Sequence, residues 1–360
     1  MKSAATIGLQ RLARQGIGGA QPAQPADVVG RLGFVQAQDY LGALWAVGAR
    51  LPGAREADIE RALAGRSIVR TWPARGTLHF VAAADVRWML HLLTPRMVAR
   101  SAGRDRQLGL DDDTYARSGA ALSRALEGGR QLSRDALYDA LEAAHISTEG
   151  QRGIHILGRL AQLGLICFGP RQGKQQTFVL LDEWLPRSGR SEPPRDQALA
   201  ELARRYFFSR GPATLADFVW WSGLTTADAR AGIEAAQPDL AAEEIRGQTY
   251  WQGASAPKGP ADPPPACLLP AFDEYLVGYK DRSAVLGPGY TTAVNAGGGM
   301  LSPVIIIDGL VVGTWKRTLK KETVVITPNW FRPPKKAQQA ALLHAARRYG
   351  DFLERTAVVA

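Results

Sequence analysis

One arrangement constrains the fold more than any other feature, and it occurs three times: helical segments, then two short apolar strands joined by a turn. Helices followed by a hairpin in this order are typical of a winged helix. We therefore predict an α+β protein, mainly α, with three tandem winged-helix modules followed by a small antiparallel β-rich element and a C-terminal helix. The expected domains are residues 1–100, 101–190, 191–254 and 255–360.

The first copy contains a short segment between two helices, residues 34–38, that is predicted to be extended. Asp27 lies near the start of the preceding helix and Gly33 ends it. Two apolar strands then flank Pro73-Ala74-Arg75-Gly76, whose residue types predict a hairpin turn. The helices predicted for this copy are 25–32, 41–49 and 56–64, and the strands are 68–72 and 77–81.

The second and third copies follow the same order. In the second, residues 169–176 form a basic, glycine-containing tip with Arg171 and Lys174. The third follows a Pro-rich joint at 186–194, and its helices open with Thr-x-x-Asp patterns that resemble capping boxes. The second copy has predicted helices at 134–144 and 154–163 and strands at 165–168 and 177–181. The third has predicted helices at 197–209, 214–221 and 225–236 and a wing strand at 245–251.

The last third of the chain has a different pattern. A linker rich in Pro, Ala and Gly spans residues 253–265. Three apolar strands follow, with Asp308-Gly309 as a tight turn and Pro328 expected to interrupt the sheet. The predicted strands are 304–307, 310–316 and 322–327, and the closing helix is 335–352.

Charge and composition indicate the class of partner. The 360 residues include 44 Lys and Arg against 34 Asp and Glu, a formal net charge of +10. This balance favours nucleic acid first and an anionic membrane surface second. We find no apolar run long enough for a membrane span and no leader of signal-peptide type, so we expect a cytoplasmic protein. Cys167 and Cys267 have neither zinc-ligand nor disulfide spacing, and both are expected to be buried, reduced thiols.

Three stretches in this order carry a family resemblance: Val35-Gln36-Ala37-Gln38-Asp39, Arg70-Thr71-Trp72-Pro73-Ala74-Arg75-Gly76-Thr77-Leu78-His79, and Pro270-Ala271-Phe272-Asp273-Glu274-Tyr275-Leu276-Val277-Gly278-Tyr279-Lys280-Asp281-Arg282. Over about residues 5–352 the chain resembles the AlkZ-like family of winged-helix DNA glycosylases, which includes the YcaQ-type proteins. The resemblance implies a cleft that holds DNA and hydrolysis of the N-glycosidic bond of cationic alkylpurines, in some members within interstrand crosslinks.

The resemblance also implies the catalytic residues. Gln36, Ala37 and Gln38 match the Gln-x-Gln branch of the family signature, and Arg75, Gly76, Thr77 and His79 match its Arg-Gly-Thr-x-His wing. The Gln-x-Gln branch is functionally varied, so the substrate does not carry over.

Glutamine is chemically suited to hold a water molecule but not to act as a base. Residues two apart point the same way only on an extended segment, so Gln36 and Gln38 converge only if this stretch is extended. Each amide accepts and donates hydrogen bonds, and an alkylated purine that is already cationic departs without a general acid. No metal or organic cofactor is needed. The alternative is that both glutamines satisfy backbone groups at strand ends.

Other residues are assigned with a structural alternative beside each. Asp273 and Glu274 stabilise positive charge at the reacting sugar or base, or form salt bridges to Lys280 or Arg282. His79 contacts phosphate or is a core histidine. No lysine adjoins the glutamine pair, so we predict a monofunctional glycosylase, with Lys280 as a remote Schiff-base candidate. The DNA-binding candidates are Arg75, His79, Arg171, Lys174, Lys280, Arg282, Lys316, Arg317, Lys320 and Lys321.

The expected partner is double-stranded DNA with alkylated or crosslinked bases, bound by a monomer. The competing hypothesis is a noncatalytic winged-helix DNA-binding protein or transcription regulator, which would show sequence preference and dimerise. Against it, the sequence has no evident dimerisation helix. A third hypothesis is a structural protein that binds drug or RNA, and no residue pattern supports it.

Overall fold

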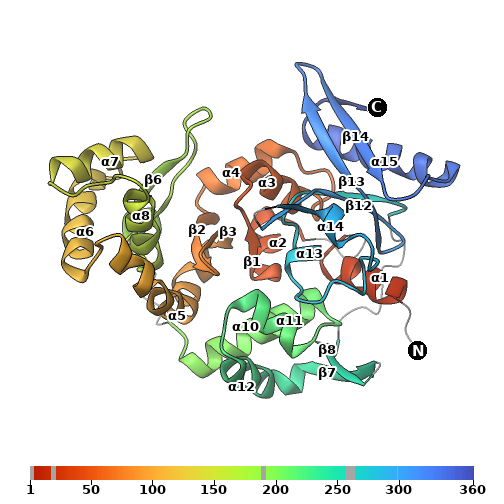
Figure 1. The fold of residues 1–360 in the computed structure, drawn as a ribbon, viewed down its shortest axis with the longest axis horizontal. Helices are drawn as coiled ribbons and strands as arrows, with labels where there is room; N and C mark the ends of the chain where they lie inside the picture. The colour runs from red at the N-terminus through yellow and green to blue at the C-terminus, as the bar shows by residue number, and fades with distance from the viewer. Residues whose placement is uncertain (1–3, 18–21, 188–191, 246, 256–263, 298) are drawn as a thin grey trace.

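A computed structural model describes residues 4–17, 22–187, 192–245, 247–255, 264–297 and 299–360. The chain forms a helical lobe at one side, a central sheet, a second helical lobe and a C-terminal β-rich part (Figure 1). The prediction of a mainly helical α+β protein is confirmed. The N-terminal tripeptide, the joint at 186–194 and the linker at 253–265 lie wholly or partly outside the described residues.

The first part of the chain has the expected order of helices and hairpin. The helix after Pro25 ends where Gly33 takes a φ of 79°, a left-handed conformation that glycine adopts without strain. Asp39 caps the next helix by accepting a hydrogen bond from the Gly42 N–H. The elements are α1 (Ala4–Arg14), α2 (Pro25–Leu32), β1 (Phe34–Gln36), α3 (Tyr40–Gly48), α4 (Glu56–Ala64), β2 (Ile68–Ala74) and β3 (Thr77–Ala82).

The β2–β3 turn is tighter than the sequence indicated. Strand β2 continues through Pro73 and Ala74, so only Arg75 and Gly76 form the turn. Their φ values of 54° and 70° are both positive, as a two-residue hairpin with matching twist requires.

The first and second units share one sheet. Its strand order is β1-β3-β2-β5-β6-β4, and the two hairpins join where Arg70 on β2 pairs with Phe168 on β5. The expected boundary between residues 100 and 101 falls inside α5, a helix that runs without a break from one unit to the other. The elements are η1 (Ala83–Asp85), α5 (Val86–Gln107), α6 (Asp112–Leu126), β4 (Leu132–Ser133), α7 (Arg134–Ala143), α8 (Arg152–Gln162), β5 (Ile166–Phe168), β6 (Thr177–Leu180) and α9 (Leu181–Trp184).

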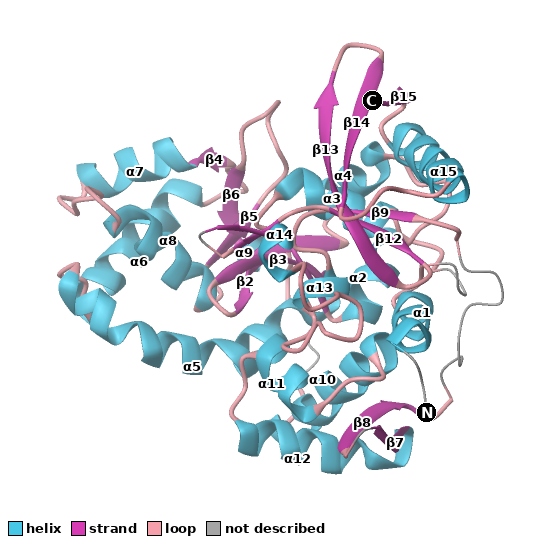
Figure 2. Ribbon diagram, turned by 45° about the vertical axis from the view of Figure 1, so that its right-hand side comes forward, coloured by secondary structure: helices cyan, strands magenta, loops and turns pink. Residues whose placement is uncertain are grey.

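The third unit is a helical lobe with its own two-stranded hairpin (Figure 2). Thr214 and Asp217 form the predicted capping box, each accepting from the other's backbone N–H. The single wing strand expected at 245–251 is wrong, because that stretch spans a turn with Gly247 at a φ of 75°. The elements are α10 (Arg195–Arg210), α11 (Leu215–Ser222), α12 (Thr226–Ala236), η2 (Gln237–Asp239), β7 (Leu240–Ile245) and β8 (Gln248–Gly253).

The C-terminal part contains a five-stranded sheet of order β15-β14-β13-β12-β9. The three predicted strands are present, but β15 pairs with β14 in parallel, so the sheet is not wholly antiparallel. The elements are β9 (Cys267–Leu269), α13 (Glu274–Val277), α14 (Thr291–Val294), β10 (Asn295–Gly297), β11 (Met300–Leu301), β12 (Val304–Ile307), β13 (Leu310–Leu319), β14 (Thr323–Trp330), α15 (Lys336–Phe352) and β15 (Thr356–Val359).

Pro328 does not interrupt this sheet, contrary to expectation. It lies within β14 opposite Trp315, whose own N–H donates to Pro303 on the other side of β13. The missing proline N–H is therefore not required by the pairing with β13, and β15 pairs only with Thr323–Ile326.

The C-terminal sheet and α15 pack on the first unit in one continuous core. The Trp45 indole donates to the Leu268 carbonyl at 2.7 Å, and its ring contacts Tyr349 and Phe352. Gly48 permits the approach of α15, because a Cβ there would lie 2.4 Å from the Phe352 ring. The first unit thus lies between the second unit and the C-terminal part. None of the described helices is both long and apolar enough to cross a membrane.

Candidate functional site

The two candidate glutamines lie where β1 ends. Gln36 is the last residue of the strand, opposite His79 on β3, whereas Gln38 lies in the bend that follows. The backbone stays paired past the strand, because the Ala37 N–H donates to the Leu78 carbonyl at 2.7 Å. The extended conformation expected for this segment is therefore found at Gln36 and ends before Gln38.

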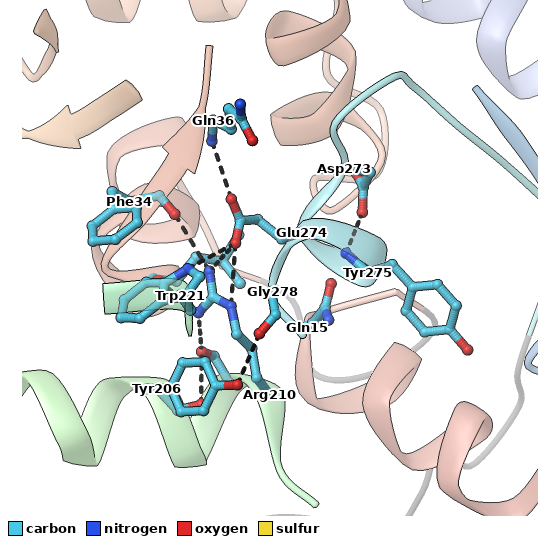
Figure 3. Close-up of polar contacts among 12 residues, drawn as sticks. Gln15, Phe34, Gln36, Tyr206, Arg210, Trp221, Asp273, Glu274, Tyr275 and Gly278 are labelled. Carbon is cyan, nitrogen blue, oxygen red and sulfur yellow. Dashed lines mark hydrogen bonds and ion pairs between the residues drawn. The ribbon is translucent and has the colours of Figure 1, made fainter. Parts of the chain in front are cut away.

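The two glutamine side chains differ in surroundings. Gln36 is 9% exposed, and its side-chain amide has no hydrogen-bond partner among the described residues. In Figure 3 this amide points away from Glu274. Gln38 is exposed, and its Oε1 accepts from the Leu78 N–H at 3.2 Å. One amide is thus unengaged beside a second that the backbone of β3 fixes in place.

Glu274 holds the backbone at Gln36. Its Oε1 accepts from the Gln36 N–H at 3.1 Å, and its Oε2 accepts from Arg210 Nη2 at 2.5 Å and from the Trp221 indole at 3.0 Å (Figure 3). The Glu274 and Arg210 side chains are fully buried. A buried carboxylate is retained only with such charged and hydrogen-bonded partners. The salt bridge expected from Lys280 or Arg282 to this carboxylate is wrong: Arg210, on another unit, provides it.

Arg210 also fixes the start of β1. Its Nη1 donates to the Leu32 carbonyl at 2.7 Å and its Nη2 to the Phe34 carbonyl at 3.4 Å. The Phe34 ring stacks on Trp221 with centroids 4.1 Å apart. Helices α10 and α11 of the third unit therefore position the strand that carries Gln36.

Arg70 contacts the peptide between the two glutamines. Its Nε and Nη2 both donate to the Ala37 carbonyl, at 3.1 and 2.8 Å. The guanidinium lies between the rings of Phe168 and Tyr40, with no ion pair to a described carboxylate. Burial lowers the pKa of Arg70 to about 10, so the group stays charged at neutral pH. Arg70 lies within the motif at residues 70–79, but no pattern in the sequence indicates this role for it.

Asp273 is structural. Both of its oxygens accept from Arg50 at 2.8 Å, and its Oδ1 also caps α13 through the Tyr275 N–H. Both side chains of this ion pair are fully buried. The structural alternative therefore fits Asp273, with Arg50 as the partner in place of Lys280 or Arg282.

His79 and Arg75 face the interior at the same end of the sheet. His79 is fully buried, and burial together with the nearby Arg75 charge lowers its pKa well below the usual value. The imidazole is then neutral, with Nδ1 2.9 Å from the Thr77 carbonyl and Nε2 3.2 Å from Arg75 Nη2. The expected phosphate contact by His79 is wrong, because no polar atom of a fully buried ring reaches DNA.

Arg75 is less enclosed. Its Nη1 donates to the Trp221 carbonyl at 2.6 Å, and burial lowers its pKa to about 10. The residue is partly buried at the turn and lines a groove between the second and third units. Its guanidinium is therefore committed mainly to the protein, in contrast to the free wing-tip cation that the sequence indicated.

The remaining basic candidates lie in three places. Lys174 is exposed at the β5–β6 tip, beside Arg171, which pairs with Glu60 at 3.0 Å and stacks over Tyr40. Lys316, Lys320 and Lys321 are exposed along the β13–β14 hairpin. The β5–β6 and β13–β14 hairpins project in the same direction in both views (Figures 1 and 2). Of the others, Lys280 is exposed, Arg282 donates to the Leu276 carbonyl, and Arg317 bonds to the Tyr349 hydroxyl.

We next consider metal sites and reactive thiols among the described residues. They contain no cluster of His, Cys, Asp and Glu that would hold a metal ion. Cys167 and Cys267 are both buried, and burial raises the pKa of each thiol.

The chain is similar to known proteins over nearly all of its length. A model of the family described as DNA glycosylase AlkZ-like matches residues 29–352. A Streptomyces sahachiroi protein named interstrand DNA cross-link repair glycosylase is 29% identical over 360 aligned residues, covering 94% of this chain and 95% of the relative. The solved structure of Streptomyces sahachiroi DNA glycosylase AlkZ has a TM-score of 0.80 and 25% identity, and the match covers 100% of both chains.

Proposed function

This chain belongs to the AlkZ-like DNA glycosylase family, and we propose that it hydrolyses the N-glycosidic bond of N7- or N3-alkylated purines in duplex DNA. The observation that carries this proposal is the unengaged amide of Gln36 on a strand end that is held from both sides. Glu274 fixes the N–H of Gln36, and Arg70 fixes the carbonyl of the next residue. A side chain without a partner among the described residues, on so constrained a backbone, supports a role for Gln36 in binding a ligand.

The proposed ligand of Gln36 and Gln38 is the attacking water. An amide accepts and donates at once, so two amides orient a water without removing its proton. The departing alkylpurine is cationic and leaves as a neutral base, and the sugar passes through an oxocarbenium-like state. Positioning then supplies much of the rate acceleration. This chemistry favours cationic lesions over neutral ones such as uracil.

Glu274 and Arg70 act here as positioning residues. Both oxygens of Glu274 already accept hydrogen bonds from the protein, and the Arg210 charge lies 2.5 Å away. Glu274 is therefore better suited to hold the strand than to take a proton from water. Arg70 does the same at the Ala37 carbonyl, between the two glutamines. Asp273 stabilises α13 and does not contact the pair.

The substrate is proposed to be double-stranded DNA, bound by a monomer in the cytoplasm. Lys174 on one hairpin and Lys316, Lys320 and Lys321 on the other present exposed cations on hairpins that point the same way. Bulky adducts and interstrand crosslinks are included as substrates, because the relative from Streptomyces sahachiroi is named for crosslink repair.

The test is release of base from a duplex that carries a single N7-methylguanine. Wild type is compared with Gln36→Ala, Gln38→Ala and the double variant at matched DNA occupancy. Release by wild type and its loss in the double variant support the proposed water site. Release that survives both substitutions would contradict it. Tight, sequence-selective binding without release from methylated or crosslinked DNA would instead favour a noncatalytic regulator.

A further inference from the structure

A groove of about 710 Å³ lies between the second and third units, apart from the glutamine pair. Its walls are one face of α5, one face of α8, and the end of α11 with the turn after it. The β2–β3 turn closes one side through Arg75 and Gly76. The volume falls within the range of about 300–1,000 Å³ typical of small-ligand sites.

The groove carries positive charge that no protein group neutralises. Arg96 and Arg100 are exposed, lie one turn apart on α5, and have no ion pair or side-chain hydrogen bond within the described chain. The carboxylate of Asp105 also lines the groove, but it is engaged by Arg159 at 2.5 Å and by the Tyr115 hydroxyl at 3.0 Å. The free guanidiniums therefore make this part of the groove suited to bind an anion.

Apolar and aromatic surface lies beside these cations. Trp220 is 48% exposed and Ile154 is 42% exposed, although both are large apolar side chains. Gly158 lies in the middle of α8 facing the groove, and a Cβ there would meet no atom within 4 Å. A glycine inside a helix destabilises it relative to alanine, so open space in front of Gly158 points to close approach of a ligand.

We propose that this groove binds one unpaired nucleotide of DNA, with its base on Trp220 and its phosphates on Arg96 and Arg100. An exposed ring beside guanidiniums is the chemistry by which proteins hold single-stranded nucleic acid, because every base offers a face for stacking. A base within a duplex is already stacked and does not offer that face. The inference rests on the proposed function only in taking DNA as the partner.

The position of the groove relates it to the glutamine pair. Arg75 at its edge contacts His79, and His79 pairs across the sheet with Gln36. Contacts through two residues, Arg75 and His79, therefore connect the edge of the groove to the strand that carries Gln36.

The experiment measures affinity for fluorescein-labelled oligothymidylate and for a duplex of equal length, by fluorescence anisotropy over a range of salt. The variants are Trp220→Ala, Arg96→Ala/Arg100→Ala and Gly158→Leu. The control is Arg106→Ala, which removes an exposed charge from the same helix outside the groove. Melting temperatures are recorded for each variant.

We expect Trp220→Ala to weaken single-strand binding about tenfold. The double arginine variant should reduce the slope of log affinity against log salt by about 0.7 for each lost contact. Gly158→Leu should fill the groove and weaken binding while the melting temperature stays the same or rises, because leucine is the better helix former. Arg106→Ala should leave the salt slope near that of wild type.

Two results would overturn the proposal. One is a change in salt slope for Arg96→Ala/Arg100→Ala no larger than that of Arg106→Ala. The other is unchanged single-strand affinity in both Trp220→Ala and Gly158→Leu. Base release is assayed separately. If the proposed glycosylase mechanism fails but these binding effects are seen, the groove proposal is retained. If base release depends on the glutamines as proposed but these binding effects are absent, only the groove proposal is wrong.

Discussion

The two hairpins of the central sheet resemble each other in sequence but not in surroundings. Both combine short apolar strands with arginines near the turn. In β2–β3 the basic residues Arg70, Arg75 and His79 donate to or contact groups of the protein itself. In β5–β6 the tip projects from the body and Lys174 is exposed. In the first hairpin the basic residues therefore bind protein groups around the candidate site. In the second hairpin Lys174 is exposed to solvent.

The physical cause of the difference is the neighbour on each side. Strand β3 is covered by β1, and the third unit closes over the turn through Trp221. Charges enclosed in this way must find partners, since an unpaired buried charge is strongly destabilising. At the β5–β6 tip Arg171 pairs with Glu60, but Lys174 has no side-chain partner among the described residues and remains exposed to solvent.

The largest expected effect comes from breaking the charge pair that supports the first region. Glu274→Gln leaves Arg210 buried without its counter-charge and should destabilise the fold by about 3–5 kcal/mol. Urea unfolding followed by circular dichroism measures this. The double variant Glu274→Leu/Arg210→Met should lose less than the single one, and an equal or larger loss in the double variant would contradict a role for the buried charge.

Arg70→Met tests whether the first hairpin positions the glutamines. Base release should slow by about 10²-fold, because a displacement of about 1 Å at a reacting centre has an effect of that size. DNA affinity should stay near that of wild type, and Arg70→Lys should restore part of the rate. In a Gln36→Ala/Gln38→Ala background, Arg70→Met should have no further effect. An additive loss there would show that Arg70 acts independently of the pair.

His79 should make stability depend on pH. Its pKa in the folded protein is lowered well below 6.5, so below about pH 6.5 the unfolded chain takes up a proton that the folded chain does not. The stability contributed by neutral His79 is complete above pH 6.5 and falls as the pH drops, by at most about 1.4 kcal/mol per pH unit. Urea unfolding at pH 5.5 and 7.5 measures this. His79→Gln should flatten the dependence, and an unchanged slope would assign it to other groups.

The smallest effect is expected at the second hairpin. Lys174→Ala removes one exposed charge and should lower the salt slope of duplex binding by about 0.9, with an unchanged melting temperature. Arg171→Ala makes a useful contrast, since Arg171 also pairs with Glu60 and stacks on Tyr40. It should lower the melting temperature as well. If Lys174→Ala leaves the salt slope unchanged, the β5–β6 tip does not contact phosphate.

Most of the helices and strands could be predicted from local sequence alone. Apolar periodicity and capping residues located the helices, and Gly33, Thr214 and Asp308-Gly309 act at the element ends where their chemistry places them. These features depend on interactions within a few residues of one another. The family resemblance also pointed to Gln36 and Gln38, whose side chains differ in burial and partners in a way that no local pattern indicates.

The pairing of buried charges could not be predicted from local sequence, because it depends on how distant segments pack. Glu274 pairs with Arg210 and Asp273 with Arg50, across 64 and 223 residues of sequence. Local sequence likewise does not predict that the two hairpins join into one sheet where Arg70 pairs with Phe168. An arginine or histidine has the same helix and strand propensity whether its side chain binds phosphate or a buried carbonyl. Its role follows from the desolvation that packing imposes, and packing involves residues that the sequence does not place side by side.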